Sequence, residues 1–323
     1  MRRRCVREEA DAPARAGRKG EAESVVAAEA IRREGAAPGL RTVLVGLVGR
    51  GIQQSRTPFM HEAEGRAQGL AYVYRLLDTD RMGTPRPALS EIIRFAELFG
   101  FSGFNVTFPY KQEILQLLDE LSPAARDLGS VNTVVLRDGR RYGHNTDMWG
   151  FGESFRRGMA GAARDTVLLV GAGGAGVAVA HALLDLGVAR LLIHDLDATR
   201  AAILASRLEA RFGAGRAAAS ADPAAALAEA DGMVNATPVG MAKLPGLPVP
   251  AQCLRPAHWV ADIVYFPLET DLLRHARSLG CRTLSGEGMA VYQAVRAFEH
   301  FTGLSPDANR FKAAFAAFDR APG

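Results

Sequence analysis

Short apolar runs and amphipathic stretches alternate along the chain from Thr42 onward. The run "TVLVGLVG" is apolar throughout and ends in glycine, which is typical of a buried strand. A helix is predicted over residues 58–68, before the strand-like "AYVYRLLD" and a helical "ALSEIIRFAELFG". A strand in "FSGFNVTF", a helix in "KQEILQLLDEL" and a strand, turn and strand in "VNTVVLRDGRRYGHNTD" follow. Strands that alternate with helices predict a mostly parallel sheet with helices on both faces.

A second alternating unit begins near Asp165. It opens with the strand "TVLLV", a glycine-rich turn and a helix that ends at Leu186, and it continues with the strand "RLLIHD". Further strands are predicted in "GMVNAT", "HWVADIVY" and "CRTL", and further helices over residues 289–302 and 306–318. The pattern therefore predicts an α/β protein of two domains.

The first 41 residues differ in composition from the rest. They are rich in Ala, Arg, Glu and Gly and contain no aromatic residue, which predicts a disordered tail with at most a frayed helix over residues 24–33. They carry ten Lys/Arg and seven Asp/Glu, whereas the other 282 residues carry 29 and 28. The basic excess belongs to the tail, so the folded part is not expected to bind nucleic acid. Nucleic-acid binding by the tail alone is an alternative that the sequence leaves open.

Several classes of site are disfavoured by composition. No apolar run is long enough to span a membrane, and the N-terminus has no hydrophobic signal segment, so we expect a cytoplasmic protein without membrane contact. Cys5, Cys253 and Cys281 are far apart, which predicts free thiols and neither a disulfide framework nor a zinc site. Seven histidines lack metal-ligand spacing, so no metal site is predicted. His144, beside "NTD", is a catalytic candidate for which packing in a loop is the favoured interpretation.

A glycine motif lies between the strand "TVLLV" and the helix that follows it. Gly171, Gly173 and Gly176 have the GxGxxG spacing, which allows a tight turn, close approach of the main chain to a pyrophosphate, and close packing of helix on strand. Asp195 ends the next strand, nineteen residues after Gly176, where a carboxylate accepts hydrogen bonds from ribose hydroxyls and repels the extra phosphate of NADP. The motif predicts a dinucleotide site, with NAD as the cofactor. A glycine-rich turn without a ligand is the weaker alternative.

Residues suited to proton transfer follow strands of the first unit. A nicotinamide cofactor implies hydride transfer, and the oxidation of an alcohol also needs a base for the hydroxyl proton. "NVTFPYK" offers Thr107 and Lys111, "VNT" offers Asn132, and "HNTD" offers Asp147. A lysine beside a carboxylate can be a general base that the carboxylate orients. Taken singly, Lys111 fits a solvated residue at a helix start better, and Asp147 fits a helix cap better.

The loop Ser55-Arg56-Thr57-Pro58 places two hydroxyls one residue apart before a proline. Thr57 is a good N-cap, and Pro58 suits the first helical position, where a missing N–H costs nothing. A helix N-terminus is also suited to an anion because its free N–H groups point outward. On this stretch alone we predict a helix start, with ligand binding as the lesser alternative.

Together the motifs resemble those of the shikimate dehydrogenase family, most closely its NAD-dependent quinate/shikimate dehydrogenase branch. They are, in the family's order and spacing, "SRTP", "NVTFPYK", "SVNTV", "HNTD", "GAGGAG", "VNATPVGM", "DIVYFP" and "GMAVYQAV". The resemblance covers about residues 43–318. It implies a catalytic, substrate-binding α/β domain with a mostly parallel sheet at residues 42–146 and 287–323. It also implies a Rossmann-type NAD-binding domain at residues 147–286, with the active site between the two.

The resemblance assigns roles by position. Lys111 would be the acid/base, with Asp147 as its partner. Ser55 and Thr57 would hold the substrate carboxylate. The substrate hydroxyls and ring would contact Thr107, Asn132, Gln293 and Tyr265. The cofactor would contact Gly171, Ala172, Gly173, Gly174, Ala175, Gly176, Asp195, Asn235, Ala236, Thr237 and Met289.

Two departures from the usual family pattern bear on specificity. NADP-using members commonly have "NRT" where this chain has Asp195-Leu196-Asp197, so the cation that grips the 2′-phosphate is missing and NAD is expected. The hydroxyl pair is Ser-x-Thr, whereas the biosynthetic enzymes usually have Ser-x-Ser. The extra methyl group resembles the quinate/shikimate branch, although one methyl does not predict a ratio of activities.

The expected function is therefore the reversible, NAD-dependent oxidation of the C3 hydroxyl of quinate and/or shikimate to the 3-dehydro acid, in aromatic amino acid biosynthesis or quinate catabolism. Two alternatives stay open: an NADP-dependent biosynthetic shikimate dehydrogenase, and a non-catalytic sensor of quinate or shikimate. The expected partner is a small-molecule substrate, and the expected assembly is a monomer or homodimer.

Overall fold

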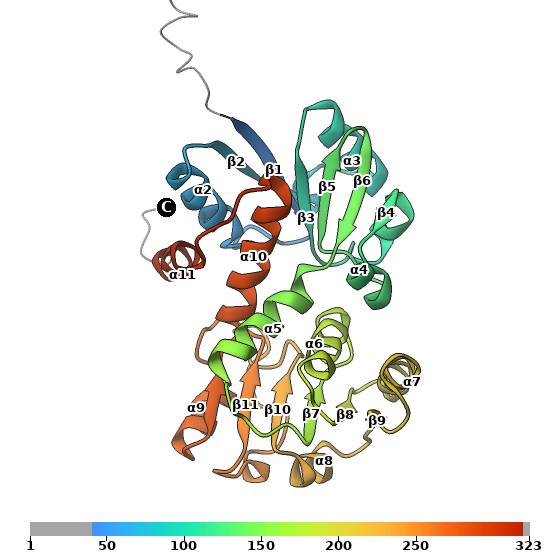
Figure 1. Cartoon of the computed structure of the whole chain (residues 1–323), viewed down its shortest axis with the longest axis vertical. Helices are drawn as coiled ribbons and strands as arrows, with labels where there is room; N and C mark the ends of the chain where they lie inside the picture. Colours follow the sequence, from blue (N-terminus) through green and yellow to red (C-terminus); the bar gives the residue numbers. More distant parts are fainter. Residues whose placement is uncertain (1–40, 319–323) are drawn as a thin grey trace, which may run out of the picture. The chain divides into compact units, whose positions relative to one another are not determined.

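The computed structural model describes residues 41–318, and these contain two six-stranded sheets (Figure 1). The helix suggested over residues 24–33 and Cys5 lie outside the described residues. We call the sheet formed by residues before Asn145 the first sheet, and the sheet formed by residues after Asp165 the second sheet. The α/β class predicted from the alternation of strands and helices is confirmed.

The first sheet has the strand order β2-β1-β3-β5-β6-β4. Its strands are β1 (Thr42–Gly49), β2 (Ala71–Asp78), β3 (Gly103–Val106), β4 (Glu120–Leu121), β5 (Thr133–Arg137) and β6 (Arg140–His144). Strand β1 pairs in parallel with β2 and β3, and β4 pairs in parallel with β6, whereas β5 is antiparallel to both of its neighbours. The β5–β6 hairpin turns at Asp138 and Gly139, which both have positive φ, as a two-residue hairpin loop requires. The sheet is therefore mixed, with parallel pairings in the majority.

Helices cover both faces of the first sheet. They are α2 (Thr57–Ala67), α3 (Leu89–Leu98), α4 (Pro123–Leu128), α10 (Glu287–Thr302) and α11 (Ala308–Ala317), with 3-10 turns η1 (Thr79–Arg81) and η2 (Glu113–Leu117). On one face, Phe298 of α10 and Phe311 and Phe315 of α11 pack with Val43 and Val45 of β1. On the other face, Ile93 of α3 packs with Phe104 of β3. The last two helices of the chain thus complete the core of the first sheet.

The second sheet is parallel throughout, with the order β12-β11-β10-β7-β8-β9. Its strands are β7 (Thr166–Val170), β8 (Arg190–His194), β9 (Ala217–Ala219), β10 (Gly232–Asn235), β11 (Trp259–Asp262) and β12 (Arg282–Leu284). Its helices are α6 (Gly174–Asp185), α7 (Ala198–Phe212), α8 (Pro223–Glu229) and α9 (Asp271–Ser278), with the 3-10 turn η3 (Ala251–Cys253). This is the strand order of a Rossmann fold, in which ligands bind where the order reverses, between β7 and β10.

Helix α5 (Thr146–Gly158) leads from the first sheet to the second and packs along α10 and against α6 (Figure 1). Asn145 caps it, because the Asn145 carboxamide oxygen accepts hydrogen bonds from the N–H groups of Asp147 and Met148. The close approach to α10 depends on Gly150, where a Cβ would lie 2.7 Å from the Gln293 nitrogen. The start of α5 is thereby fixed between the two sheets.

Three local predictions were wrong or incomplete. "KQEILQLLDEL" forms η2 and the short strand β4, because the Asp119 carboxylate accepts the Arg141 N–H and the chain then pairs with β6. Helices α4 and α5 and strand β9 were not predicted as separate elements. Helix α2 begins at Thr57, with Arg56 as its N-cap, so Pro58 occupies its second position and Thr57 is not the cap.

Candidate active site

Lys111 and Asp147 form an ion pair in the structure. Lys111 lies in the loop after β3, where its carbonyl accepts the Val131 N–H at 2.9 Å. Asp147 lies in the first turn of α5. The Lys111 Nζ is 2.5 Å from the Asp147 Oδ2, and the two side chains are 25% and 11% exposed. The carboxylate therefore orients a partly sheltered amine, the arrangement that a lysine acid/base needs.

A buried polar network lies beside this pair. The Asn132 Nδ2 donates to the Thr146 Oγ1 at 3.0 Å, and the Thr146 N–H donates to the Asn132 Oδ1 at 2.8 Å. The Thr146 hydroxyl also donates to the Gln293 Oε1 of α10 at 3.5 Å. The structure therefore links two predicted substrate residues through Thr146, which sequence reasoning did not single out. Its only signal is its place inside the quoted motif "HNTD", directly before Asp147.

The hydroxyls of Ser55 and Thr57 bond to each other. The Ser55 Oγ donates to the Thr57 Oγ1 at 3.1 Å and accepts the Thr57 N–H at 3.3 Å. The first hydrogen bond of the α2 helix runs from the Met60 N–H to the Arg56 carbonyl, so Arg56 occupies the N-cap position predicted for Thr57. In the part of the chain that the structure describes, neither hydroxyl bonds to another predicted site residue.

Tyr265 shares its surroundings with the charged groups of two other loops. Its side chain is 42% exposed. Desolvation raises the pKa of the Tyr265 phenol, and the charges of Lys111 and Arg56 oppose that rise, because both cations act on the ring electrostatically. Asp147 adds a smaller effect that raises the pKa. The charges of the Ser55–Thr57 loop and of the Lys111–Asp147 pair thus both act on Tyr265.

Thr107 lies between β3 and Lys111. Its N–H donates to the Val48 carbonyl at 2.9 Å, which continues the pairing of β3 with β1. A Cβ at Gly49 would overlap the Thr107 methyl group, so glycine is required there for the Thr107 side chain to occupy its place. Thr107 thereby lies beside the end of β1, four residues before the catalytic candidate Lys111.

The glycine loop after β7 has the geometry of a phosphate cradle. Gly171 has a φ of +105°, and a Cβ there would lie 2.8 Å from the Ala236 carbonyl oxygen. A Cβ at Gly176 would overlap the Gly171 carbonyl, so the helix packs on the strand only because both residues are glycine. No heavy atom lies within 4 Å of a Cβ placed at Gly173 or Gly174, which leaves the N-terminus of α6 open. The residues present therefore fit a dinucleotide pyrophosphate.

Asp195 is held in place by the main chain around it. Its Oδ2 accepts the Ala172 N–H of the glycine loop at 2.7 Å, and its Oδ1 accepts the Asp197 N–H at 2.9 Å. Leu196 is 99% exposed. Arg200 lies one turn further and its Nε is 3.4 Å from the Asp197 carboxylate. The side of the loop where a ribose 2′-substituent would lie thus carries two carboxylates and one arginine that is already paired.

The loop after β10 is organised by a carboxylate that sequence reasoning missed. The Asn235 Nδ2 donates to the Asp262 Oδ1 at 3.0 Å and to the Val239 carbonyl at 2.9 Å. The Asp262 carboxylate also accepts the Thr270 hydroxyl at 2.7 Å, and burial raises its pKa to about 6. The signal for Asp262 was its position at the end of the strand in "HWVADIVY", beside Asn235 in the parallel register.

The other predicted cofactor residues lie in this loop, in α10 and in the glycine loop. The Ala236 N–H donates to the Val170 carbonyl at 2.7 Å, and the Thr237 hydroxyl donates to the Asn235 Oδ1 at 2.7 Å. Met289 is 9% exposed in the core that α10 shares with the second sheet. Ala172 and Ala175 lie within the glycine loop and the first turn of α6.

His144 packs against a second histidine. Its ring stacks on that of His300 with centroids 4.0 Å apart and planes 21° apart. Burial lowers the pKa of His144, and the charges of Arg296 and Arg137 lower it further. The stacking gives the ring a packing role in the β6–α10 contact.

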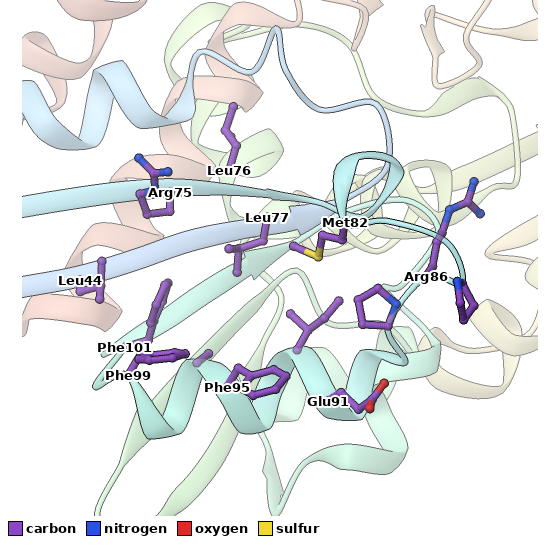
Figure 2. Close-up of a pocket in the computed structure, with 14 residues that line it drawn as sticks. Leu44, Arg75, Leu76, Leu77, Met82, Arg86, Glu91, Phe95, Phe99 and Phe101 are labelled. Carbon is purple, nitrogen blue, oxygen red and sulfur yellow. The ribbon is translucent and has the colours of Figure 1, made fainter.

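Other candidate features lie away from these residues. A cavity of about 920 Å³ lies between β2 and α3 and contains none of the predicted site residues; Figure 2 shows Phe95, Phe99 and Phe101 grouped along it. Within residues 41–318, no three His, Cys, Asp or Glu side chains converge as metal ligands. The helices found among residues 41–318 are too short or too polar to span a bilayer.

The sequence of this chain is similar to those of known dehydrogenases. Residues 47–134 match the "Shikimate dehydrogenase substrate binding domain", and residues 286–314 match the "Shikimate 5'-dehydrogenase C-terminal domain". The chain is 53% identical over 275 residues to the shikimate dehydrogenase (NADP(+)) of Streptomyces avermitilis, which covers 84% of this chain and 94% of the relative. It is 50% identical over 279 residues to the quinate/shikimate dehydrogenase (NAD(+)) of Corynebacterium efficiens, which covers 85% and 98%.

Solved structures agree with these relatives. Quinate dehydrogenase from Corynebacterium glutamicum in complex with NAD has a TM-score of 0.83 and 48% identity, and the match covers 86% of this chain and 99% of that one. Shikimate 5-dehydrogenase from Thermus thermophilus in complex with NADP(H) and shikimate has a TM-score of 0.76 and 33% identity, with 85% and 99% covered. The similar proteins thus include users of both nicotinamide cofactors.

Proposed function

Because the chain belongs to the shikimate dehydrogenase family, we propose that it reversibly oxidises the C3 hydroxyl of quinate and/or shikimate to the 3-dehydro acid. The observation that carries this proposal is the 2.5 Å contact between the Lys111 Nζ and the Asp147 carboxylate. A non-catalytic sensor needs no such pair beside an open glycine loop. The division into a substrate domain (residues 42–146 and 287–323) and a cofactor domain (residues 147–286) is part of the same proposal.

In the proposed reaction, Lys111 exchanges the proton of the substrate hydroxyl. During oxidation its amine accepts that proton, and during reduction its ammonium returns it to the carbonyl oxygen. Asp147 keeps the lysine amine oriented through its carboxylate. A bound nicotinamide supplies the hydride acceptor. The protein's own contribution is to hold the hydroxyl against Lys111 and to exchange its proton at that atom.

Substrate binding is assigned to side chains around this pair. Ser55 and Thr57 hold the ring carboxylate at the start of α2, where N–H groups favour an anion. Thr107, Asn132, Gln293 and Tyr265 contact the hydroxyls and the ring. The Asn132–Thr146–Gln293 network supports this proposal, because it fixes two of these amides before a substrate arrives.

The cofactor is proposed to be NAD, held by the glycine loop, by Asp195 and by the loop from Asn235 to Thr237. Family membership does not decide between NAD and NADP, because the named relatives use both. The support comes from this chain: Asp195 accepts the Ala172 N–H and lies beside Asp197, so a 2′-phosphate would meet negative charge. NADP is the second candidate, and the specific observation in its favour is Arg200 at the start of α7.

The test is the rate of nicotinamide reduction with quinate and with shikimate, each with NAD and with NADP. We expect a higher kcat/KM with NAD. The double variant Leu196→Arg, Asp197→Thr supplies a cation at an exposed position and frees Arg200, so we expect it to shift the preference toward NADP by about tenfold or more. Ile203→Arg, which adds a cation at an exposed apolar residue within α7, is the matched control and leaves the preference unchanged. A strong NADP preference of the wild type would contradict the argument from Asp195.

A further inference from the structure

Arg56 separates the two hydroxyls of the Ser55–Thr57 loop and is itself anchored to the C-terminal helix. Its side chain is 5% exposed, and its Nη1 donates to the Phe315 carbonyl at 3.1 Å. The guanidinium carbon lies 4.6 Å from the centre of the Phe315 ring and 5.4 Å from that of Phe318. The residue between the two predicted carboxylate ligands thus binds the last turn of α11, which packs beside α2 (Figure 1).

The chemistry of this anchor explains why an arginine suits it. The removal of a guanidinium from water is costly unless its N–H groups and its faces find partners. Carbonyls at the end of a helix carry partial negative charge, and aromatic rings attract a cation over their faces. The planar guanidinium uses both kinds of contact at once, whereas the compact ammonium of lysine does not. The anchor is therefore specific in geometry as well as in charge.

Main-chain hydrogen bonds on each side of Arg56 hold the residues that carry the two hydroxyls. The Arg56 carbonyl accepts the Met60 N–H at 3.2 Å, which closes the first turn of α2. The Ser55 N–H donates to the Ile52 carbonyl at 3.0 Å, which closes the preceding turn. Ser55 and Thr57 therefore have little freedom to move independently of Arg56.

Helix α11 also reaches the other side of the proposed substrate site. The Phe315 ring contacts the Tyr265 ring edge to face, with centroids 6.2 Å apart. The same residue therefore supports Tyr265 with its ring and Arg56 with its ring and carbonyl. The end of α11 is thus a common support for two of the predicted substrate-binding segments.

We propose that Arg56 is a positioning residue for the substrate carboxylate: it fixes the Ser55–Thr57 loop to the end of α11 and so sets the placement of both hydroxyls. This inference rests on the proposed function, because it assumes that these hydroxyls hold a carboxylate. It assigns a substrate-binding task to the C-terminal helix, which contributes no predicted contact of its own.

The structure offers a matched control at the other end of α11. The Arg310 Nε is 2.6 Å from the Glu64 carboxylate of α2, and Glu64 is fully buried. This ion pair joins the same two helices but is not attached to the Ser55–Thr57 loop. Its loss should weaken the docking of α11 without moving the hydroxyls.

The experiment compares Arg56→Gln, Arg56→Lys and Arg310→Gln in steady-state kinetics, with the thermal midpoint and the Kd for NAD as further readouts. Arg56→Gln should raise the KM for quinate and shikimate about tenfold or more, with kcat changed less than about threefold and the Kd for NAD unchanged. Arg56→Lys should recover only part of the loss. Arg310→Gln should lower the midpoint while leaving the KM within about twofold of the wild type.

Two outcomes would overturn the inference. One is a KM for Arg56→Gln within twofold of the wild type, and the other is an equal rise in KM for Arg310→Gln, which would show only general docking of α11. If Arg56→Gln does not fold, Arg56→Lys keeps the charge but loses the planar guanidinium, and a KM within twofold of the wild type for that variant would then overturn the inference. A wild type that oxidises neither acid would instead contradict the proposed function, so the two failures are distinguishable.

Discussion

The two sheets present their proposed binding groups in different ways. At the end of β7 the second sheet offers the main chain of six consecutive residues. Gly171 and Gly176 are needed there because a Cβ would collide with the main chain, whereas Gly173 and Gly174 leave the N-terminus of α6 open. Beside the first sheet, the corresponding groups are side chains from separate segments between Ser55 and Gln293. A site built from main-chain groups can be recognised from one short sequence motif. A site built from side chains of distant segments forms only when the whole chain has folded.

This difference predicts different responses to substitution. The glycine loop should be sensitive to the size of a side chain and insensitive to its chemistry, because its binding groups are N–H donors. The side-chain site should respond to single functional groups while the fold stays intact. The first prediction, which has the largest expected effect, tests that contrast, and the two that follow compare buried titratable groups of the two sheets.

The largest effect is expected within the glycine loop. Gly176→Ala places a methyl group against the Gly171 carbonyl, so it should lower the free energy of unfolding by about 3 kcal/mol and abolish measurable cofactor binding. Gly173→Ala meets no atom within 4 Å and should cost less than about 1 kcal/mol in stability. It should still weaken cofactor binding at least about tenfold, because the main chain must approach the pyrophosphate there. Denaturant unfolding and titration with NAD measure both quantities.

If Gly173→Ala and the wild type bind the cofactor with equal affinity, the loop serves only the packing of α6 on β7. That result would contradict the difference proposed between the two sheets. Equal stability of Gly176→Ala and the wild type would contradict the steric argument itself.

The next effect concerns acid stability in the core of the first sheet. His61 is fully buried among aromatic rings, and burial lowers its pKa from 6.5 to about 3. Below pH 6.5 the unfolded chain binds a proton that the folded chain does not bind until about pH 3, so this contribution to stability falls as the pH falls through that window. At pH 5 the loss is about 2 kcal/mol relative to neutral pH. The variant His61→Gln should lack this part of the slope in unfolding experiments between pH 7 and pH 5, and an unchanged slope would refute the assignment.

The second sheet should show an effect of similar size and opposite sign. Burial raises the pKa of Asp262 from 3.8 to about 6, so its contribution to stability is present below pH 3.8 and is lost as the pH rises through 6. Asp262→Asn keeps an acceptor for the Asn235 amide and the Val264 N–H and removes the buried charge. We expect this variant to gain up to about 3 kcal/mol at pH 8 and nothing near pH 4. A loss of stability at pH 8 would mean that the ionised carboxylate is needed to hold these loops.

Sequence patterns predicted much of the fold for a physical reason. Strands β1 and β7 are buried on both faces, so each appears as an unbroken apolar run whatever the rest of the chain does. The segment "KQEILQLLDEL" misled because its apolar spacing suits a helix, whereas β6 and the Asp119 carboxylate determine its actual structure. The N-cap of α2 was misplaced by one residue, because the Met60 N–H bonds to the Arg56 carbonyl and Thr57 is already the first helical residue.

Some parts of the candidate site could likewise be predicted from the sequence, and others could not. The glycine loop and Asp195 could be placed from local spacing alone, since one strand, one turn and one helix determine them. The Asn132–Thr146–Gln293 network joins residues far apart in sequence, and no local pattern indicates that they meet. The carboxylate of Asp262 and the anchor at Arg56 are likewise visible only after folding, because their partners lie on other elements.

The most direct test of the central claim is the activity of Lys111→Ala measured together with its substrate affinity. We expect kcat for the oxidation of quinate or shikimate to fall about a thousandfold while the Kd for the acid, measured by calorimetry, changes only a few-fold. Lys312→Ala, which changes a lysine of α11 outside the site, should keep the wild-type kcat. A Lys111→Ala enzyme that turns over within about tenfold of the wild type would show that another group carries the proton, and would contradict the account.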